Sequence, residues 1–188
     1  MSRVPTIRIV KRKSILAIAI TVGVFAVFGG KAMSAQDKYT VSVPNGLAFS
    51  EFRGFEGWQT ISVSQSEKLG LIEVILGNPA MVEASMSGLP AEGKQFPDGV
   101  RIAKIHWKAT KSTEAPSPTT VPGALDDIDF MVKDSKRFPA TGGWGWAQFD
   151  YDAASDTFKP LGTGAACGYA CHTLVKAKDY VFTAYGKR

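Results

Sequence analysis

The residues best suited to chemistry lie near the C-terminus, in the segment CGYACHTLVKAKDYVFT, residues 167–183. This segment contains both cysteines of the chain, Cys167 and Cys171, and one of its two histidines, His172. Two thiols followed by an imidazole are the groups that attach a haem covalently, because C-x-x-C-H is the usual attachment motif. Here three residues separate the cysteines instead of two, so the motif is one residue longer than usual.

The residues of this cluster leave three interpretations open. The thiols could form thioethers with porphyrin vinyl groups while His172 ligates the iron, and the additional residue would then bulge out of the loop. The thiols could instead form one disulfide, the ordinary outcome for two cysteines in an exported chain, which requires no histidine. A metal or redox site without porphyrin is the third, but the chain has too few Cys and His residues for a four-coordinate zinc site.

The N-terminal segment has the order of a secretory signal. Residues 1–13 carry five basic residues and no acid, an apolar run covers residues 14–30, and small residues follow. We therefore expect residues 1–35 to be a signal peptide, cleaved after Ser34 or Ala35, that exports the protein to the periplasm. An uncleaved membrane anchor is the alternative, although the apolar run is short for a membrane span.

Loss of this segment changes the charge of the protein. The whole chain has 22 Lys and Arg against 17 Asp and Glu, and six of the basic residues but no acid lie in residues 1–35. The remaining 16 basic and 17 acidic residues give a net charge near −1. The high isoelectric point of the precursor therefore does not indicate nucleic-acid binding. Residues 36–188 are enough for one domain with its own core.

The elements that must position the cluster are mainly strands. β-branched residues recur on both sides of a polar turn and predict the strands 58–65 and 71–76. Asn78 can cap a helix N-terminus and Pro79 suits its first position, so a short helix is predicted over residues 79–87. The segment DYVFTAY, residues 179–185, is predicted to close the chain as a final strand.

Three further strands show a period of two or a glycine–tryptophan pattern. In FPDGVRIAKIHWK, residues 96–108, one face holds Val100, Ile102, Lys104, His106 and Lys108. In DDIDFMVKD, residues 126–134, one face holds Asp127, Asp129, Met131 and Lys133, opposite Ile128, Phe130 and Val132. In GGWGWAQFDYD, residues 142–152, the glycines around Trp144 and Trp146 leave room for a bulky group.

The segment between the first two of these strands is rich in Pro, Ser and Thr. We expect residues 109–124 to form an irregular loop. The fold class predicted from all elements is α+β, a mainly antiparallel sheet with a few short helices.

Three of these stretches together resemble the cytochrome P-460 family, which includes the cytochromes c′-β. They are FPDGVRIAKIHWK, FMVKDSKRFPATGGWGW and CGYACHTLVKAKDYVFT, and their order and spacing match over residues 58–185 or so. The resemblance implies an antiparallel sheet packed on a c-type haem, usually in a homodimer. It places the thioethers at Cys167 and Cys171 and the axial iron ligand at His172.

The resemblance also implies two residues on the opposite side of the haem. Cytochromes P-460 link a lysine covalently to the porphyrin edge, and this lysine corresponds to Lys104. Hydroxylamine-oxidising members carry a carboxylate that assists proton transfer, and it corresponds to Asp129. The alternatives are a Lys104 whose ammonium reaches water and an Asp129 that is an ordinary exposed carboxylate. Relatives carry an arginine where Glu73 stands, so the effect of a cation there is absent or reversed.

Other side chains could fill the sixth coordination position of the iron. His106 is either such a ligand or a hydrogen-bonded histidine on the sheet. Met81, Met86 and Met131 are formally possible ligands, although methionine is more often found as core filler.

Three functions follow from these expectations. The first is an exported enzyme that oxidises hydroxylamine at a five-coordinate haem and passes electrons to a soluble redox partner. The second is a non-enzymatic binder of nitric oxide, similar to cytochrome c′-β, with an apolar pocket rich in phenylalanine. The third is a periplasmic electron-transfer cytochrome with its sixth position filled. The phenylalanines considered for the pocket are Phe49, Phe52, Phe55, Phe96 and Phe130.

Overall fold

A computed structural model describes residues 36–162 and 164–187, with the backbone alone at residues 164–167. The predicted signal peptide, residues 1–35, lies outside the described residues. All described elements belong to the unit Ser34–Arg188. Within the described part of the chain, no helix has the length and apolar character needed to cross a membrane.

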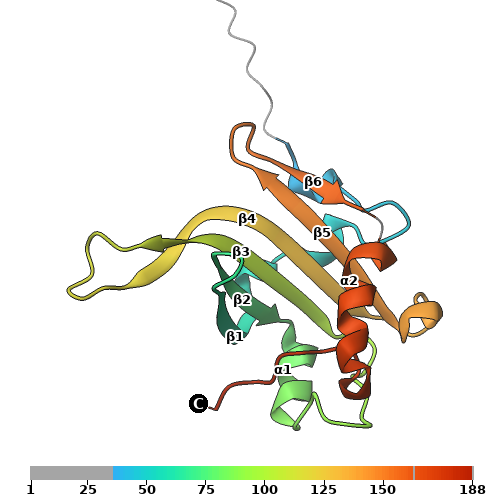
Figure 1. Ribbon diagram of the computed structural model, residues 1–188. Coiled ribbons are helices and arrows are strands. Elements are labelled where there is room, and N and C mark those ends of the chain that lie inside the picture. Colours follow the sequence, from blue (N-terminus) through green and yellow to red (C-terminus); the bar gives the residue numbers. More distant parts are fainter. Residues whose placement is uncertain (1–35, 163, 188) are drawn as a thin grey trace, which may run out of the picture. The chain divides into compact units, whose positions relative to one another are not determined.

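Six antiparallel strands form one sheet in which each strand pairs with the next along the chain. Figure 1 shows this meander from β1 to β6. The sheet confirms the prediction of a mainly antiparallel fold. The strands are β1 Gln59–Ser66, β2 Leu71–Gly77, β3 Arg101–Lys111, β4 Thr120–Lys133, β5 Trp144–Asp152 and β6 Thr157–Leu161.

Short helical segments connect and cover the sheet. The helix predicted after β2 is confirmed as α1, Pro79–Met86, and the side chain of Asn78 accepts a hydrogen bond from the backbone N–H of Met81 at 3.0 Å. The second α-helix, α2, is Gly164–His172 and carries the Cys-Cys-His cluster. The 3-10 segments are η1 Lys38–Thr40, η2 Phe49–Phe52, η3 Phe55–Gly57, η4 Pro139–Thr141 and η5 Thr173–Lys178.

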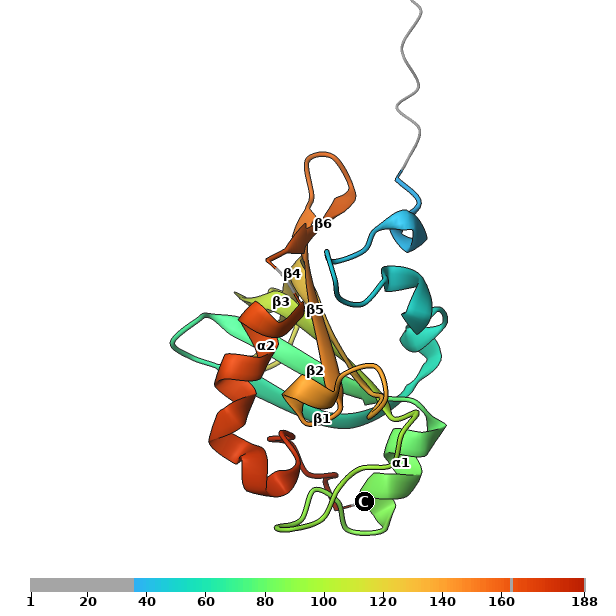
Figure 2. The same ribbon diagram turned by 90° about the vertical axis from the view of Figure 1, so that its right-hand side faces the viewer.

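The two faces of the sheet are covered by different parts of the chain. Figure 2 shows the N-terminal 3-10 segments on one side of the sheet and α2 on the other. The first side is an aromatic core in which the ring of Phe49 contacts Phe55, Phe130 and Phe149. The second side is a core of mixed residues that includes Met81 of α1 and Trp146 of β5.

The period-two alternation predicted for β3 and β4 is confirmed. Ala103 and Phe130 belong to the aromatic core, whereas their neighbours Ile102 and Met131 belong to the core on the other side. Each central strand therefore contributes side chains to both cores, as expected for a sheet that is buried on both faces.

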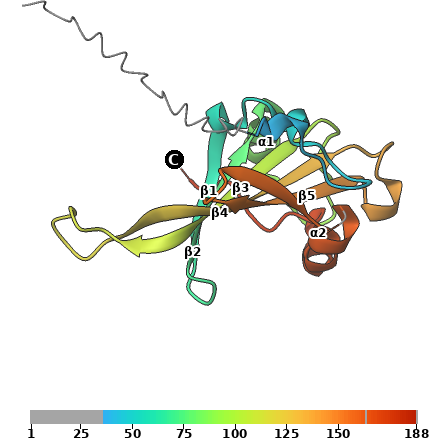
Figure 3. The ribbon, with the colours of Figure 1, turned by 90° about the horizontal axis from the view of Figure 1, so that it is seen from above.

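The irregular loop expected at residues 109–124 is shorter than predicted. β3 continues to Lys111 and β4 begins at Thr120, so only residues 112–119 lie outside the strands, and this hairpin extends past the other strands in Figure 3. The prediction failed because proline was taken as a sign of irregular structure. Pro122 pairs with Ala109 of β3, but the pairing of β4 with β5 starts only at Asp127. Proline has no backbone N–H to donate, but at Pro122 only β3 is a neighbour, so the strand can accommodate it.

The final strand predicted at residues 179–185 is wrong. Asp179 and Tyr180 have φ values of 51° and 64°, and residues 181–187 have no regular structure. Two consecutive residues in the left-handed region turn the chain, so it cannot continue as an extended strand. The turn brings the backbone carbonyl of Tyr180 to the side chain of His172.

Candidate cofactor site

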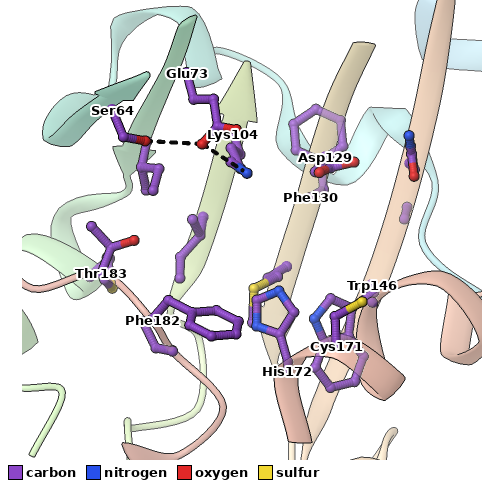
Figure 4. Close-up of a pocket in the computed structure, with 18 of the residues that line it drawn as sticks. Ser64, Glu73, Lys104, Asp129, Phe130, Trp146, Cys171, His172, Phe182 and Thr183 are labelled. Atoms are coloured by element: carbon purple, nitrogen blue, oxygen red, sulfur yellow. Dashed lines mark hydrogen bonds and ion pairs between the residues drawn. The ribbon is translucent and has the colours of Figure 1, made fainter. Parts of the chain in front are cut away.

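A cavity of about 490 Å³ lies between the sheet and the C-terminal part of the chain. Its size falls within the range of several hundred Å³ that is typical of sites for small molecules. Figure 4 shows His172, Cys171 and Trp146 at one end of this cavity, and Lys104, Glu73 and Asp129 at the other. The remaining lining residues come from β1, β2, β3, β4, β5, β6, α1, α2 and the C-terminal segment.

Helix α2 packs directly on β5. A Cβ atom at Gly168 would lie 2.2 Å from the side chain of Trp146, so glycine is required for this close approach. The ring of Trp146 lies 5.7 Å from that of Tyr169 and 5.9 Å from that of His172. The packing therefore fixes which side of α2 faces the cavity, and this side includes Cys171 and His172.

The imidazole of His172 is held by the backbone of the turn that follows. Its Nδ1 lies 2.5 Å from the carbonyl oxygen of Tyr180. A carbonyl only accepts hydrogen bonds, so the ring proton is on Nδ1 and the lone pair of Nε2 is free for a metal. Burial lowers the pKa of His172, the bond to Tyr180 opposes this, and the positive charge of Lys104 lowers the pKa further. His172 is therefore a neutral imidazole at neutral pH.

A buried ion pair holds the turn itself. Nζ of Lys133 lies 2.8 Å from each carboxylate oxygen of Asp179, and it also donates to the carbonyl of Gly142 at 2.9 Å. The backbone N–H of Phe96 donates to the same carboxylate at 2.8 Å. Because Asp179 precedes Tyr180, these contacts fix the position of the carbonyl that holds His172.

Sequence reasoning missed this ion pair. The available signal was the alternation of β4, which places Lys133 on the same face as Met131, a buried position. A lysine on an inward-facing position requires a buried acid, because an unpaired charge inside a protein is strongly unfavourable. The partner could not be identified, because residues 179–185 were expected to form a strand.

The opposite end of the cavity is polar. Nζ of Lys104 lies 3.2 Å from a carboxylate oxygen of Glu73, and Lys104 is paired with Asp129 in the register of β3 and β4. All three residues line the cavity. The structure thus brings Lys104 and Asp129 together on the wall across from His172. The position where relatives carry an arginine holds a carboxylate that pairs with Lys104.

Asp129 has an unusual environment for a carboxyl group. Burial and the negative charge of Asp127 raise its pKa to about 7, although the charges of His106 and Lys104 act in the opposite direction. About a third of the side chain, 35%, is exposed, and this exposed part faces the cavity. Asp129 therefore exchanges its proton near neutral pH at a position that a bound molecule can reach.

His106 is confirmed as a hydrogen-bonded histidine. Its Nδ1 lies 2.5 Å from Oδ1 of Asp127, and the residue is not part of the cavity wall. Burial opposes ionisation of the imidazole, but the bond to Asp127 and the charge of Asp127 outweigh burial and raise the pKa of His106. Of the methionines considered as ligands, Met81 and Met131 line the cavity, while Met86 is 73% exposed elsewhere.

Of the five phenylalanines considered for an apolar pocket, Phe130 alone lines the cavity. Phe49, Phe52 and Phe55 lie in the aromatic core on the other side of the sheet. Phe96 packs against Trp144, and the ring of Phe130 stacks on Phe52 although Phe130 borders the cavity. The sequence did not indicate which face of the sheet Phe49, Phe52 and Phe55 would cover, because they lie outside the strands and show no period of two.

The residues around the cavity fit a haem. His172 offers a neutral imidazole with a free nitrogen, and Cys171 beside it is a free, exposed thiol. Cys167 belongs to α2, one helical turn before Cys171, so both positions lie on one side of the helix, although the Cys167 side chain is not among those described. The indole of Trp146 lines the cavity, and its buried Nε1 has no hydrogen-bond partner among the described residues.

Comparison with known proteins supports the same assignment. The family model described as Cytochrome P460 matches residues 52–183, most of the chain. The match covers the sheet, α2 and the turn at Asp179, and so includes every residue discussed for the cavity. No curated protein sequence shows a significant match.

Proposed function

The chain belongs to the cytochrome P460 family, and we propose that it is an exported c-type haem protein that oxidises hydroxylamine in this cavity. One observation carries the proposal: a neutral imidazole, His172, stands at one end of the cavity, and a carboxyl group with a pKa of about 7, Asp129, stands at the other. A bound haem supplies an iron that takes up electrons from a nitrogen ligand. The residues of the chain hold the cofactor and move protons.

The C-terminal cluster holds the cofactor. His172 would hold the iron through Nε2, because Nδ1 is engaged with the carbonyl of Tyr180. Cys171 and Cys167 would form the two thioethers, since both positions lie on one side of α2. The packing of α2 on Trp146 keeps this side toward the sheet.

Lys104 is the residue that would be joined to the edge of a bound porphyrin. Its ammonium would first have to give up a proton. The carboxylate of Glu73, 3.2 Å from Nζ, is the nearest acceptor for that proton. The position of Lys104 on the wall across from His172 supports this role.

Asp129 acts as a general base. Oxidation of hydroxylamine releases protons together with electrons, and a base works best when its pKa lies near the working pH. Asp129 meets this condition and faces the cavity. We assign it the removal of protons from the bound N–H and O–H groups.

The two other functions receive less support from the cavity. A simple gas binder needs no proton acceptor, yet Glu73, Lys104 and Asp129 line one end. An electron carrier needs a sixth ligand. His106 is engaged with Asp127 outside the cavity wall, and Met81 and Met131, which border the cavity, are packed in the core. The proposal also includes a periplasmic location for the mature protein, as the signal-like sequence of residues 1–35 indicates. It further includes a soluble redox partner and, as the family resemblance implies, a homodimer.

The test compares an Asp129→Asn variant with the parent protein, both matured in a periplasm. We expect haem content to be unchanged and the rate of hydroxylamine oxidation to fall by about 100-fold or more, as for the loss of a general base. Asp126→Asn is the matched control, because Asp126 pairs with Lys108 at 2.7 Å and does not line the cavity. A normal rate in the Asp129→Asn variant would remove this role.

A further inference from the structure

A row of polar side chains crosses the sheet beside the cavity. Each member is the direct cross-strand partner of the next, so their Cβ atoms lie about 4.5–5.5 Å apart. Because direct partners lie on the same face, the row shares the cavity side of the sheet with Lys104 and Asp129. From β1 to β6 the members are Ser64, Glu73, His106, Asp127, Asp150 and Lys159.

His106 occupies the middle of this row and is surrounded by acids. Nδ1 lies 2.5 Å from Asp127 and 4.0 Å from Asp129, both on β4, and Nε2 lies 3.6 Å from Glu73 on β2. On its own strand the nearest charges are Lys104 and, one position farther along the same face, Lys108. The residue is only 6% exposed. This buried imidazole therefore stands among three carboxylates and is hydrogen-bonded to that of Asp127.

Asp129 lines the cavity and lies next to His106, in the middle of the row. The 4.0 Å between its Oδ2 and Nδ1 of His106 is too long for a hydrogen bond but short enough for a small side-chain rotation or one bridging water. One donor atom from each of Asp129, His106 and Asp127 lies within 4.8 Å of the others. Because Nδ1 of His106 is engaged with Asp127, the short route for a proton on Asp129 leads to the carboxylate of Asp127, across a gap that one water can bridge.

The row meets solvent at its other end. Asp127 has 12% of its side chain exposed, Asp150 beside it is an exposed residue, and the side chain of Lys159 is 66% exposed. Asp127 and Asp150 are direct partners in β4 and β5. Burial and the charges of Asp127 and Asp126 raise the pKa of Asp150, which makes it a better proton acceptor than an isolated aspartate.

We propose that His106, Asp127 and Asp150 form a proton outlet, which carries to solvent the protons that Asp129 removes in the cavity. Each transfer moves one proton and no electron. Asp129 gives up its proton, the His106–Asp127 pair gains it, and the pair then releases one proton to Asp150 or water. This inference rests on the proposed function of Asp129, and it assigns His106, together with Asp127, a proton-relay role that begins at Asp129.

The same groups could bind a metal ion, since a nitrogen and two carboxylates are metal ligands. Two contacts favour the proton outlet. Nδ1 of His106 is already engaged with Asp127, and the ammonium of Lys104 stands beside Asp129 as its cross-strand partner and repels a cation. Elemental analysis of the protein distinguishes a bound metal ion from a proton outlet.

The first measurement follows the carboxyl group of Asp129 directly. Infrared difference spectra of the haem-loaded protein are recorded against pH, and the band of Asp129 is identified by its loss in Asp129→Asn. In a His106→Gln variant, the midpoint of this band should rise by about one unit, because a positive charge near the carboxylate is lost. An unchanged midpoint would show that His106 is not coupled to Asp129.

The second measurement uses turnover. With hydroxylamine as substrate in weak buffer, His106→Gln should lower kcat about tenfold, leave KM unchanged, and recover when imidazole buffer is added. Binding of nitric oxide to the ferrous protein, which needs no proton, should not change. Lys108→Gln is the control, because Lys108 lies on the same face but its side chain is 56% exposed.

A second variant, at the exposed residue Asp150, keeps the proposal testable if His106→Gln does not fold. Asp150→Asn should slow turnover in weak buffer and recover in concentrated buffer. If both variants keep the parent rate and solvent isotope effect, the outlet is refuted. If the parent protein does not oxidise hydroxylamine, the proposed function fails. The infrared titration still shows in that case whether His106 and Asp129 are coupled. Elemental analysis could instead find one non-haem metal ion per chain in the parent protein and none in His106→Gln. That result would refute the outlet and show a metal site.

Discussion

Lys133 and Asp179 form a two-point ion pair inside the protein, with both Nζ–O distances at 2.8 Å and side chains that are only 2% and 3% exposed. The pair joins residues 46 positions apart and ties the end of β4 to the turn at Tyr180. Because the carbonyl of Tyr180, the residue after Asp179, holds His172, this ion pair helps to determine the orientation of the imidazole that faces the cavity.

Replacing Lys133 should destabilise the protein strongly. Lys133→Met leaves the carboxylate of Asp179 buried without its cation, which costs about 3–5 kcal/mol in the free energy of unfolding. Denaturant unfolding measures this loss. Lys159→Met is the matched control, because its pair with Asp152 is on the surface, and we expect a change below about 1 kcal/mol. Equal losses in both variants would contradict the importance of the buried pair.

The rate of hydroxylamine oxidation should rise with pH around neutrality. Asp129 accepts a proton only when ionised, and its pKa is about 7. The rate should therefore increase about tenfold between pH 6 and pH 8, following the ionised fraction. Stopped-flow or steady-state rates across this range test the expectation. A rate that is already maximal at pH 5 would mean that another group is the base.

Protein stability should fall as pH rises through the range in which Asp129 titrates. The folded protein binds this proton up to about pH 7, whereas an unfolded aspartate releases it near 3.8. Between these values the unfolded state binds fewer protons, so the free energy of unfolding decreases with pH from this group. His106, whose pKa is raised, contributes stability that is present below its ordinary value of 6.5 and is lost as pH rises through its folded pKa. Asp129→Asn should flatten the lower part of this dependence in denaturant titrations.

Gly168→Ala should displace α2 from the sheet. The added Cβ would lie 2.2 Å from the side chain of Trp146, and such overpacking costs about 1–3 kcal/mol. We expect lower stability and lower haem incorporation, measured by denaturant unfolding and by absorbance per mole of protein. Gly57→Ala is the control, since a Cβ at Gly57 meets nothing within 4 Å. Normal haem incorporation in Gly168→Ala would contradict the close packing of α2 on β5.

Lys104→Met should abolish the covalent link to the porphyrin edge. The parent protein is expected to show a red-shifted, broadened ferrous Soret band and a haem peptide that contains Lys104. The variant should show an ordinary c-type spectrum, and Lys108→Met should behave like the parent, because Lys108 pairs with Asp126 outside the cavity wall. Peptide mass spectrometry separates the outcomes, and an unmodified Lys104 peptide from the parent would refute the link.

Much of the fold could be predicted from local pattern. The strands β1 to β4 and helix α1 follow from β-branched runs, period-two alternation and the capping residue Asn78. Alternation also assigns Lys104 and Asp129 each to one face of its own strand. These features depend only on neighbouring residues along a strand, whereas the register that makes Lys104 and Asp129 direct partners is seen only in the structure.

The remaining features depend on contacts between distant segments. The side of the sheet that receives Phe49 cannot be deduced from its neighbours, and the left-handed turn at Asp179 is stabilised by Lys133 on another strand. The buried environment that raises the pKa of Asp129 depends on Asp127, His106 and the cavity wall together. Such properties arise from packing, so the sequence pattern indicated the candidate residues but not their environment.

The most direct test of the account is the intact mass and absorbance of protein matured in a periplasm. We predict a coloured protein whose mass includes one haem, with no free thiol at Cys167 or Cys171 and His172 required for the ferrous spectrum. A colourless protein whose two sulfurs are bonded to each other would contradict the account.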